Sequence, residues 1–261
     1  MFQNLGLQLY TVRDYLRDPE FADLSFRRLR ELGYTEAQTA GFSPFAPELF
    51  GELLKKNGIR IVGTHYNYRK IIDEPEETIA LHRLWGTDNI GLGMMPPDAR
   101  ASLDGLKKFI RDFNGAAERY AKEGFKLTYH NHNFEFERVD GYKTRMEILE
   151  EEFDPKNISF VLDTCWVAAG GGDVCAWMER LAGRIDILHL KDFSVDLSDG
   201  SYRPRVCLAE VGYGNLDWNG ILKTAERIGV KHYVVEQDEN FTGTPFESLR
   251  MSADFLKKYR K

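Results

Sequence analysis

Apolar and polar positions follow a repeating unit along the chain. An amphipathic helical stretch ends at a glycine, and a short apolar run follows within one or two residues. The glycines at these stops are Gly33, Gly58, Gly124, Gly183 and Gly229. A glycine just past a helix end adopts the left-handed conformation that other residues resist. The pattern therefore predicts helix, stop and strand in succession, which is typical of parallel strands joined by helical crossovers.

The repeat predicts eight strand–helix units. Strands are expected near residues 5–10, 34–38, 59–65, 89–93, 125–132, 158–163, 185–191 and 232–238, and a helix over 245–259. An open doubly wound sheet can carry the same alternation, but the count of eight favours a closed (β/α)8 TIM barrel. Because no linker or shift in composition divides the chain, residues 1–261 are expected to form a single TIM-barrel domain. The longest irregular stretch is predicted over 194–217.

Several helices have clear starting residues. Asp18 precedes Pro19, Ser102 precedes a helical stripe of apolar residues, and Thr244 stands three residues before Glu247. Short polar side chains accept hydrogen bonds from the free N–H groups at a helix start, and a threonine followed by Glu at this spacing is a capping box. Asp18, Ser102 and Thr244 are therefore predicted to begin helices.

The charge and the cysteine count argue against several classes of protein. Lysine and arginine total 35 against 41 aspartates and glutamates, and the net charge of −6 disfavours non-specific binding to nucleic acid. No apolar run approaches the roughly 18 residues of a membrane span, and the first residues lack a secretory pattern. Three cysteines without a C-x-x-C motif argue against a disulfide framework. We expect a cytoplasmic protein that binds neither nucleic acid nor membranes, and a homo-oligomer is left open.

Polar residues stand at the ends of four consecutive predicted strands. Because alternate side chains of a barrel strand point inward, His130, Asp163, His189 and Glu236 are expected at one mouth of the barrel. Two imidazoles and two carboxylates suit divalent manganese, zinc, cobalt or iron, whereas magnesium prefers oxygen ligands. The alternative is that each is a hydrogen-bonded polar residue at a strand end. The match across four adjacent strands favours the metal site.

Further polar residues are candidates for the same mouth. Lys191 shares a face with His189 and is a candidate for binding an oxyanion, for donating a proton, or for pairing with a nearby aspartate. His132 shares a strand face with His130. His65 ends the third predicted strand, and it is expected to contact the substrate. Glu36 and Gln8 are also expected to line the mouth.

The remaining candidates are weaker. Arg205 and Glu210 lie in the irregular stretch with Gly212-Tyr213-Gly214, and they are candidates for substrate binding, although a bare G-x-G is a weak phosphate signal. The alternative is an ordinary solvated loop. His82 is expected on a helix surface, and His232 at the opposite end of the barrel in a structural role.

Several runs of the sequence resemble the xylose-isomerase-like superfamily. These runs are LQLYTVRD, YHNHNFEF, VLDTCWVAAGGGDV, RIDILHLKDF, AEVGYGNLDWNGIL and VKHYVVEQDE. The superfamily contains sugar phosphate isomerases and epimerases, inosose and 3-dehydroshikimate dehydratases, and nucleases of the endonuclease IV type. The resemblance implies a barrel with one or more divalent metals at its C-terminal mouth, held from strands five to eight. The matching positions here are His130, Asp163, His189 and Glu236.

The chain departs from this pattern at two positions. Sugar epimerases of the superfamily usually carry glutamate at the position of His130 and use two metal-bound glutamates as acid and base, whereas only Glu236 remains here. The histidine that the superfamily often carries three residues after Asp163 is replaced here by Trp166. This tryptophan is expected either to line one face of a bound sugar or to pack against the protein. Relatives often carry a functional histidine at the position of His132, which is a candidate for proton transfer or for supporting a ligand.

The resemblance and the predicted site together indicate an enzyme. We expect a divalent-metal-dependent isomerase or epimerase that acts on a keto-sugar or related polyol through an enediolate, with Glu236, His132 and Lys191 as candidate proton-transfer residues. Loss of a β-hydroxyl after the same first step gives the alternative, a dehydratase of an inosose or keto-sugar. A nuclease would need more than the six histidines present and a basic surface. A non-catalytic sugar-binding barrel is the remaining alternative.

Overall fold

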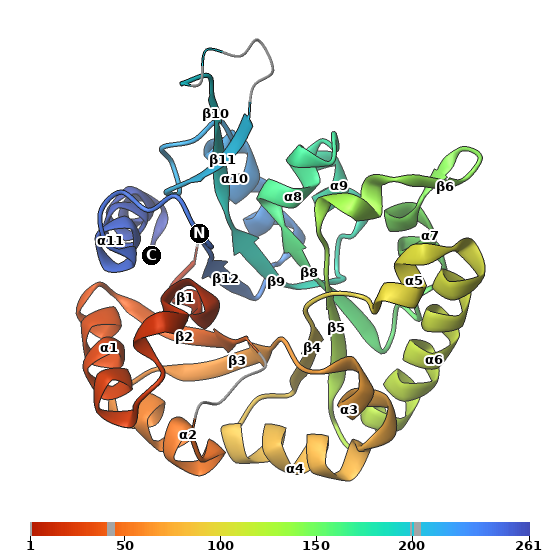
Figure 1. The fold of residues 1–261 in the computed structure, drawn as a ribbon, viewed down its shortest axis with the longest axis horizontal. Coiled ribbons are helices and arrows are strands. Elements are labelled where there is room, and N and C mark those ends of the chain that lie inside the picture. Colours follow the sequence, from red (N-terminus) through yellow and green to blue (C-terminus); the bar gives the residue numbers. More distant parts are fainter. Residues whose placement is uncertain (1, 41–44, 199, 201–204) are drawn as a thin grey trace.

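Eight parallel strands surround a common axis and form a nearly closed barrel (Figure 1). The computed structural model describes residues 2–40, 45–198, 200 and 205–261. The order of neighbouring strands is β3-β2-β1-β12-β9-β8-β5-β4. Their bounds are Leu5–Gln8 (β1), Tyr34–Thr39 (β2), Arg60–Thr64 (β3), Asn89–Leu92 (β4), Lys126–His130 (β5), Ile158–Asp163 (β8), Ile185–Leu190 (β9) and His232–Val235 (β12). The predicted (β/α)8 barrel is confirmed.

Strands β3 and β4 close the barrel through a seam with few backbone contacts. Tyr66, just past β3, bridges to Leu92, and its N–H donates to the carbonyl of Gly91 at 2.7 Å. The N–H of Gly91 donates to the hydroxyl of Thr64 at 3.3 Å. A Cβ atom at position 91 would lie 1.8 Å from the carbonyl oxygen of Thr64, so this close approach requires glycine.

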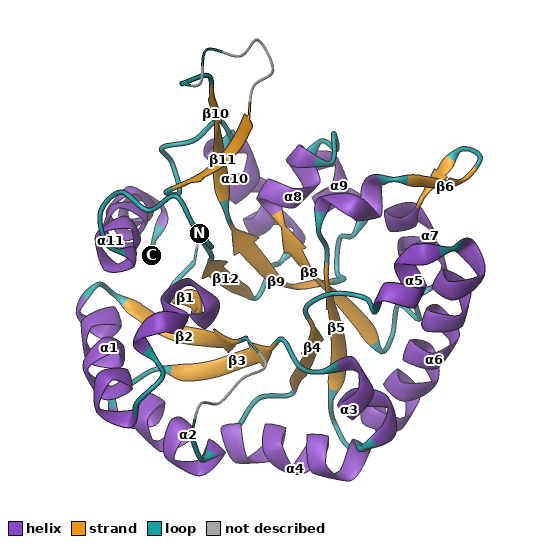
Figure 2. Ribbon diagram, viewed as in Figure 1, coloured by secondary structure: helices purple, strands orange, loops and turns teal. Residues whose placement is uncertain are grey.

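Helices form an outer ring around the strands (Figure 2). The α-helices are Pro19–Glu31 (α1), Pro47–Lys56 (α2), Tyr68–Asp73 (α3), Pro75–Trp85 (α4), Pro97–Ala101 (α5), Leu103–Lys122 (α6), Arg145–Glu152 (α7), Thr164–Ala169 (α8), Val174–Arg180 (α9), Trp218–Ile228 (α10) and Pro245–Leu256 (α11). Three 3₁₀ segments are Leu9–Tyr15 (η1), Asn133–Phe136 (η2) and Lys257–Tyr259 (η3). Asp18, Ser102 and Thr244 cap α1, α6 and α11, as predicted. Among the described residues, none of the helices has both the length and the apolar character that crossing a bilayer requires.

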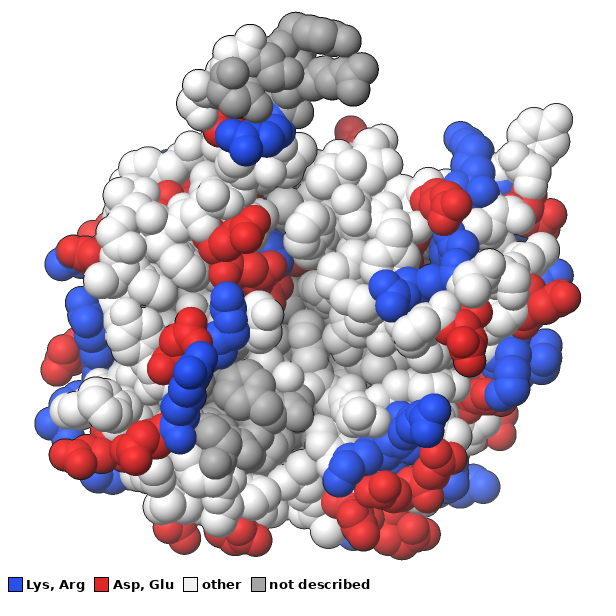
Figure 3. Space-filling model, viewed as in Figure 1, with Lys and Arg blue, Asp and Glu red and all other residues white. Residues whose placement is uncertain are grey.

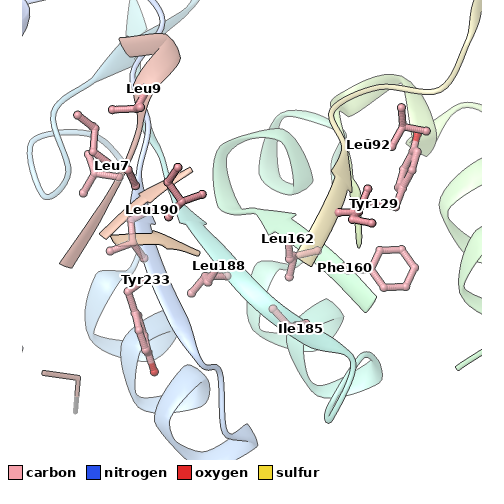
Figure 4. Close-up of a cluster of buried hydrophobic side chains, with 14 of the residues drawn as sticks. Leu7, Leu9, Leu92, Tyr129, Phe160, Leu162, Ile185, Leu188, Leu190 and Tyr233 are labelled. Carbon is pink, nitrogen blue, oxygen red and sulfur yellow. The ribbon is translucent and has the colours of Figure 1, made fainter. Parts of the chain in front are cut away.

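Apolar side chains pack on both sides of the strands. Inside the barrel, Val62, Val161, Ile187 and Val234 form one buried cluster. The last three stand two residues before three of the predicted metal donors, so the alternation of the strands places those donors next to this inner cluster. The outward-facing cluster packs the strands against the helices and includes Leu7, Leu92, Tyr129, Phe160, Leu162, Leu188 and Leu190 (Figure 4).

The stretch expected to be irregular over 194–217 contains regular structure in part, and residues 199 and 201–204 within it lie outside the described residues. Strands β10 (Asp192–Asp196) and β11 (Arg205–Ala209) pair in an antiparallel hairpin that projects from the barrel (Figure 1). Each strand has only 5 residues, which gives too few alternate positions for a clear pattern in the sequence. A second short hairpin joins β6 (Arg138–Asp140) to β7 (Lys143–Thr144).

His82 does not lie on a helix surface, so that expectation was wrong. The residue is fully buried on the face of α4 that packs against the β3–β4 seam. Its Nε2 atom lies 2.8 Å from the hydroxyl of Thr64, and its Nδ1 atom lies 2.7 Å from the carbonyl of Thr78. Burial lowers the pKa of His82 to about 4.

Candidate functional site

The four predicted metal donors meet at the mouth of the barrel. His130 Nε2 lies 3.3 Å from Asp163 Oδ2 and 3.9 Å from Glu236 Oε2. His189 Nδ1 lies 2.9 Å from the same oxygen of Glu236 and 3.7 Å from that of Asp163. One donor atom from each residue falls within 4.8 Å of all the others, and all four side chains are buried. These residues could therefore hold one metal ion.

Hydrogen bonds on the outer side of the two imidazoles orient them. His130 Nδ1 lies 3.1 Å from the carbonyl of Gly93, and His189 Nε2 is hydrogen-bonded to Gln38 Oε1. Both partners are acceptors, so each outer nitrogen carries a proton. The inner nitrogen of each ring is then the atom that can offer a lone pair to a metal, which is the usual arrangement of supporting partners around metal-binding histidines.

A buried lysine stands beside the four donors. Lys191 Nζ lies 2.6 Å from Asp238 Oδ2, 3.2 Å from Glu236 Oε2 and 3.8 Å from Asp163 Oδ2. It also lies 4.8 Å from the centre of the Trp166 ring, within range of a cation–π contact. The predicted pairing of Lys191 with an aspartate is present, and it extends to three carboxylates.

The charges at this site shift one another's ionisation. Burial alone would raise the pKa of Glu236 and of Asp163, but the Lys191 ammonium and the neighbouring imidazoles hold both below their usual values. Burial would lower the pKa of His189, but Glu236 and Asp163 raise it to about 9. The same carboxylates raise the pKa of Lys191 against the effect of burial. Such clusters of perturbed groups are concentrated at functional sites.

A cavity of about 530 Å³ opens above the four donors. The face of the molecule drawn in Figure 3 is hollowed near its centre. The lining includes Tyr10, His65, Tyr66, Tyr68, Met94, His130, His132, Lys191, Glu236 and Asp238. This volume is typical of sites for small molecules.

Several buried polar atoms at or beside the cavity have no hydrogen-bond partner in the described part of the chain. They are Gln38 Nε2, His65 Nε2, His132 Nδ1, Trp166 Nε1 and Asp238 Oδ1. Buried polar groups are nearly always paired, because an unpaired group costs about 1–3 kcal/mol. The concentration of such atoms here indicates a site that a polar ligand completes.

His132 lines the cavity but does not belong to a strand, because β5 ends at His130. It caps η2, and Glu135 Oε2 accepts a hydrogen bond from its N–H at 2.7 Å. The other oxygen of Glu135 accepts from the Tyr129 hydroxyl. Burial, together with the His130 ring 4.7 Å away, lowers the pKa of His132 to about 3, so its imidazole is neutral.

His65 and Trp166 also lie at this end of the barrel. His65 lines the cavity, and its ring centre is 4.8 Å from that of His130. Trp166 lies in α8 with its ring centre 5.8 Å from that of His132. Burial and the nearby histidines hold the pKa of His65 well below its usual value.

Glu36 lies at the opposite end of the barrel, which corrects the expectation that it lines the mouth. Its Oε2 atom is 3.0 Å from His232 Nδ1, and its Oε1 atom accepts a hydrogen bond from Arg60. Arg60 and His232 are the first residues of β3 and β12, so these contacts mark the base. Parity alone could not place Glu36, because its position along β2 decides which end it reaches. The structure puts His232 at the base, as predicted.

Arg205 and Glu210 lie away from the cavity lining, so their placement does not support the predicted contact with substrate. Arg205 pairs with Asp196 at 3.1 Å across the projecting hairpin. Glu210 accepts hydrogen bonds from the Ser248 hydroxyl at 2.6 Å and from the Thr242 N–H at 2.9 Å. Arg205 thus links the two strands of the hairpin, and Glu210 links its own segment to Thr242 and Ser248.

The G-x-G segment surrounds a carboxylate of the protein itself. Asp192 Oδ2 accepts hydrogen bonds from the N–H of Gly212 at 3.0 Å, from the N–H of Gly214 at 3.1 Å and from the Trp218 ring. Its other oxygen accepts from the N–H of Leu216 at 3.3 Å. These donors therefore bind an internal anion, and the weak phosphate signal is explained without a ligand.

Asp238, Glu135 and Gln38 hydrogen-bond to predicted site residues but were not themselves predicted. Asp238 shares its face with Glu236 through the same alternate spacing that placed the donors, so a signal was present. Glu135 stands three residues after His132, the spacing of a capping box. Gln38 gave no comparable signal, because an uncharged residue near a strand end is common.

The fold and the site together define an enzyme-like TIM barrel with a buried group of histidines and carboxylates at its C-terminal mouth. A family model for the xylose isomerase-like TIM barrel matches residues 26–259, and the chain belongs to this family. The resemblance seen in the sequence is thereby confirmed.

The similar proteins share only a small fraction of their residues with this chain. An inosose dehydratase of Geobacillus thermodenitrificans is 24% identical over 162 residues, which is 57% of this chain and 53% of that protein. The chain thus matches about half the length of this relative. A sugar phosphate isomerase/epimerase of Parabacteroides distasonis superposes with a TM-score of 0.79 at 26% identity, over 98% of this chain and 94% of the other. A D-allulose 3-epimerase of Methylomonas sp. superposes with a TM-score of 0.68 at 14% identity, over 98% of both chains, and shows the fold alone.

Proposed function

We propose that this protein is a divalent-metal-dependent enzyme that removes a proton next to the carbonyl of a keto-sugar or related polyol, and that it isomerises or epimerises this substrate. The observation that supports the proposal best is the convergence of His130, Asp163, His189 and Glu236 within 4.8 Å beneath a polar cavity. The outer hydrogen bonds of both histidines keep the inner nitrogens directed toward this centre.

The donor set fits a divalent transition metal. Two imidazole nitrogens and two carboxylate oxygens suit manganese, zinc, cobalt or iron better than magnesium. A bound ion of this kind would polarise a carbonyl and a neighbouring hydroxyl of the substrate and so acidify the adjacent C–H bond.

Glu236 is the proposed base. Its described contacts with His130, His189 and Lys191 all reach Oε2, and Oε1 takes none of them. Because Glu236 lines the cavity, Oε1 is placed to accept a proton from a substrate there. A carboxylate with one oxygen committed to the charged centre and one free can combine binding with proton transfer.

The second proton-transfer group is His132 or Lys191. The neutral His132 imidazole has an unpaired Nδ1 atom at the cavity. Lys191 carries a proton that its three carboxylate partners hold in place. His130 is less suited, because its outer nitrogen is committed to Gly93 and its inner nitrogen faces the other donors.

Dehydration is the second candidate, and Lys191 is the observation that favours it. Loss of a β-hydroxyl needs an acid at the leaving oxygen, and a buried ammonium beside Glu236 can supply that proton. The similarity to an inosose dehydratase agrees with this alternative.

The test is deuterium exchange followed by NMR. Keto-sugars and inososes would be incubated with protein loaded with Mn²⁺, Zn²⁺ or Co²⁺ in deuterated water, and with metal-free protein as the control. Deuterium at the carbon next to the carbonyl, only with metal present, is the expected result. A rearranged sugar identifies isomerisation or epimerisation, and loss of water identifies dehydration. No exchange with any of these substrates, while metal binds, would contradict the proposal and favour a binding protein.

A further inference from the structure

A chain of hydrogen bonds runs from the backbone into the cavity through two glutamines. The backbone N–H of Tyr10 donates to Gln8 Oε1 at 3.3 Å. Gln8 Nε2 then donates to Gln38 Oε1 at 3.0 Å and lies 3.3 Å from His65 Nδ1. A backbone N–H can only donate, so it decides which end of the Gln8 amide is the oxygen.

The orientation of Gln8 determines that of Gln38. If the Gln38 amide were reversed, its NH₂ group would face the NH₂ group of Gln8, and two donors would meet. Gln38 therefore presents Oε1 to Gln8, and the same oxygen accepts from His189 Nε2. The outer nitrogen of His189 carries a proton as a result.

The same amide has the opposite effect on His65. Because Gln8 Nε2 donates, His65 Nδ1 must accept, and the proton of the neutral ring then resides on Nε2. That Nε2 atom is buried and has no hydrogen-bond partner among the described residues. Gly93 packs on the ring so closely that a Cβ there would lie 2.9 Å from His65 Cγ, which keeps the ring in place.

We propose that His65 is a neutral hydrogen-bond donor, which presents its Nε2–H to the carbonyl or enediolate oxygen of the substrate, and that Gln8 is the positioning residue that sets this tautomer. The role at the substrate rests on the proposed function, whereas the tautomer does not. A nitrogen of His65 lies within 4.8 Å of donor atoms of His130 and His189, so one substrate oxygen can approach both the metal donors and His65.

The tautomer of His65 also decides between two roles for a cluster of three imidazoles. His65, His130 and His189 are close enough to resemble a second metal site. A nitrogen that carries a proton cannot ligate a metal, and the remaining nitrogen of His65 is occupied by Gln8. His65 thus acts on the substrate and not on the ion.

The tautomer can be read directly by NMR of the full-length protein with ¹⁵N-labelled histidine and glutamine. In metal-free and in Zn²⁺-loaded protein, we expect the His65 proton on Nε2 and a scalar coupling across the hydrogen bond from Gln8 Nε2 to His65 Nδ1. A proton on His65 Nδ1 in the unmodified protein would overturn the proposal.

Two matched substitutions test the relay. Gln8→Glu places an acceptor against His65 Nδ1, so a proton should appear on Nδ1. Gln38→Glu keeps an acceptor toward Gln8, so His65 should keep its proton on Nε2 alone. An unprotonated Nδ1 in a folded Gln8→Glu variant would contradict the relay. If that variant does not fold, the coupling in the unmodified protein decides.

The role at the substrate is tested with whichever compound shows exchange. His65→Phe removes the donor and should lower kcat at least tenfold with a smaller effect on KM, and His65→Gln, which retains an N–H donor, should restore part of the loss. An unchanged kcat in His65→Phe would refute the role even if the tautomer is as stated. If no compound shows exchange, the proposed function fails while the tautomer result stands on its own.

Discussion

Buried carboxylates occupy both ends of the barrel, but their partners differ. At the base, Glu36 pairs with Arg60, and Asp186 pairs with Lys126 at 3.2 Å and with Lys231 at 2.9 Å. Every oxygen of the two carboxylates has a partner. The side chains of Arg60 and Lys231 remain 62% and 61% exposed, so these cations stay in contact with water.

At the mouth, the cation is Lys191, which is almost fully withdrawn from water. The Lys191 side chain is only 2% exposed and is shared among Glu236, Asp238 and Asp163. Burying charges without water is costly, and it is seldom repaid in stability alone. Full pairing with cations that stay in contact with water therefore marks a structural site. Unpaired polar atoms around a buried cation mark a site organised around a ligand.

Replacement of Asp163 by asparagine is expected to have the largest effect. The substitution removes one charged donor while preserving volume, so affinity for Zn²⁺ or Mn²⁺ should fall by more than the roughly 100-fold that loss of a supporting partner costs. Asp186→Asn, the matched change at the base, should leave metal affinity unaltered. Titration calorimetry on both variants measures this, and stoichiometric tight binding by Asp163→Asn would rule out the assignment.

Glu236→Gln should suppress the chemical step. Loss of the proton acceptor is expected to slow C–H exchange about 100- to 1000-fold, with a smaller effect on metal affinity. Glu36→Gln at the base should leave exchange intact but destabilise the fold by about 1–3 kcal/mol, because His232 and Arg60 lose their charged partner. Exchange by NMR and urea unfolding separate the two outcomes. Equal exchange rates in both variants would count against Glu236 as the base.

Substitutions at His132 and Lys191 should identify the second proton-transfer group. If His132 has this role, His132→Gln should lower kcat about 100-fold with little change in KM, whereas Lys191→Met defines the alternative. Steady-state kinetics with the exchanging substrate distinguish them. Full activity in both variants would remove this part of the mechanism in favour of a water molecule.

The stability of the fold should respond to acid over different pH ranges at His82, beside the β3–β4 seam, and at Glu36, at the base. The folded-state pKa of His82 is about 4, below its ordinary value of 6.5, so the unfolded chain binds more protons between these pH values. Stability should therefore fall as pH drops, by about 2 kcal/mol between pH 6.5 and 5. Glu36, whose pKa is lowered by His232 and Arg60 against burial, should lose its contribution only at lower pH, as pH falls through its folded-state pKa. Urea unfolding at both pH values should show a weaker dependence for His82→Gln, and an unchanged one would be evidence against this origin.

The smallest expected effect concerns phosphate. The donors of the G-x-G segment are occupied by Asp192, and Lys191 is already surrounded by carboxylates. A phosphorylated sugar should therefore gain less than tenfold in kcat/KM over its free form at low salt, which corresponds to about 1.4 kcal/mol. A larger gain that weakens with salt would reveal a phosphate site.

The fold and the convergence of the four candidate metal donors could be predicted because both rest on local periodicity. Glycine stops fix the helix ends, and alternation along buried strands puts Asp163, His189 and Glu236 beside one another. Glu36 obeys the same parity but fails, because parity gives the face of a strand and not the height along the barrel. His82 and the Gln8–Gln38 pair depend on contacts between distant segments, which no local pattern encodes.

The seam between β3 and β4 also has a consequence for how the molecule opens. Strands β8 and β9 pair over Phe160–Asp163, whereas Tyr66 and Gly91 connect the two sides of the seam through a single backbone hydrogen bond. Amide hydrogens there should exchange with solvent sooner than those of β8 and β9, since local opening breaks few bonds. Tyr66 and Leu92 also line the cavity, so the part of the sheet that is expected to open first borders the candidate site.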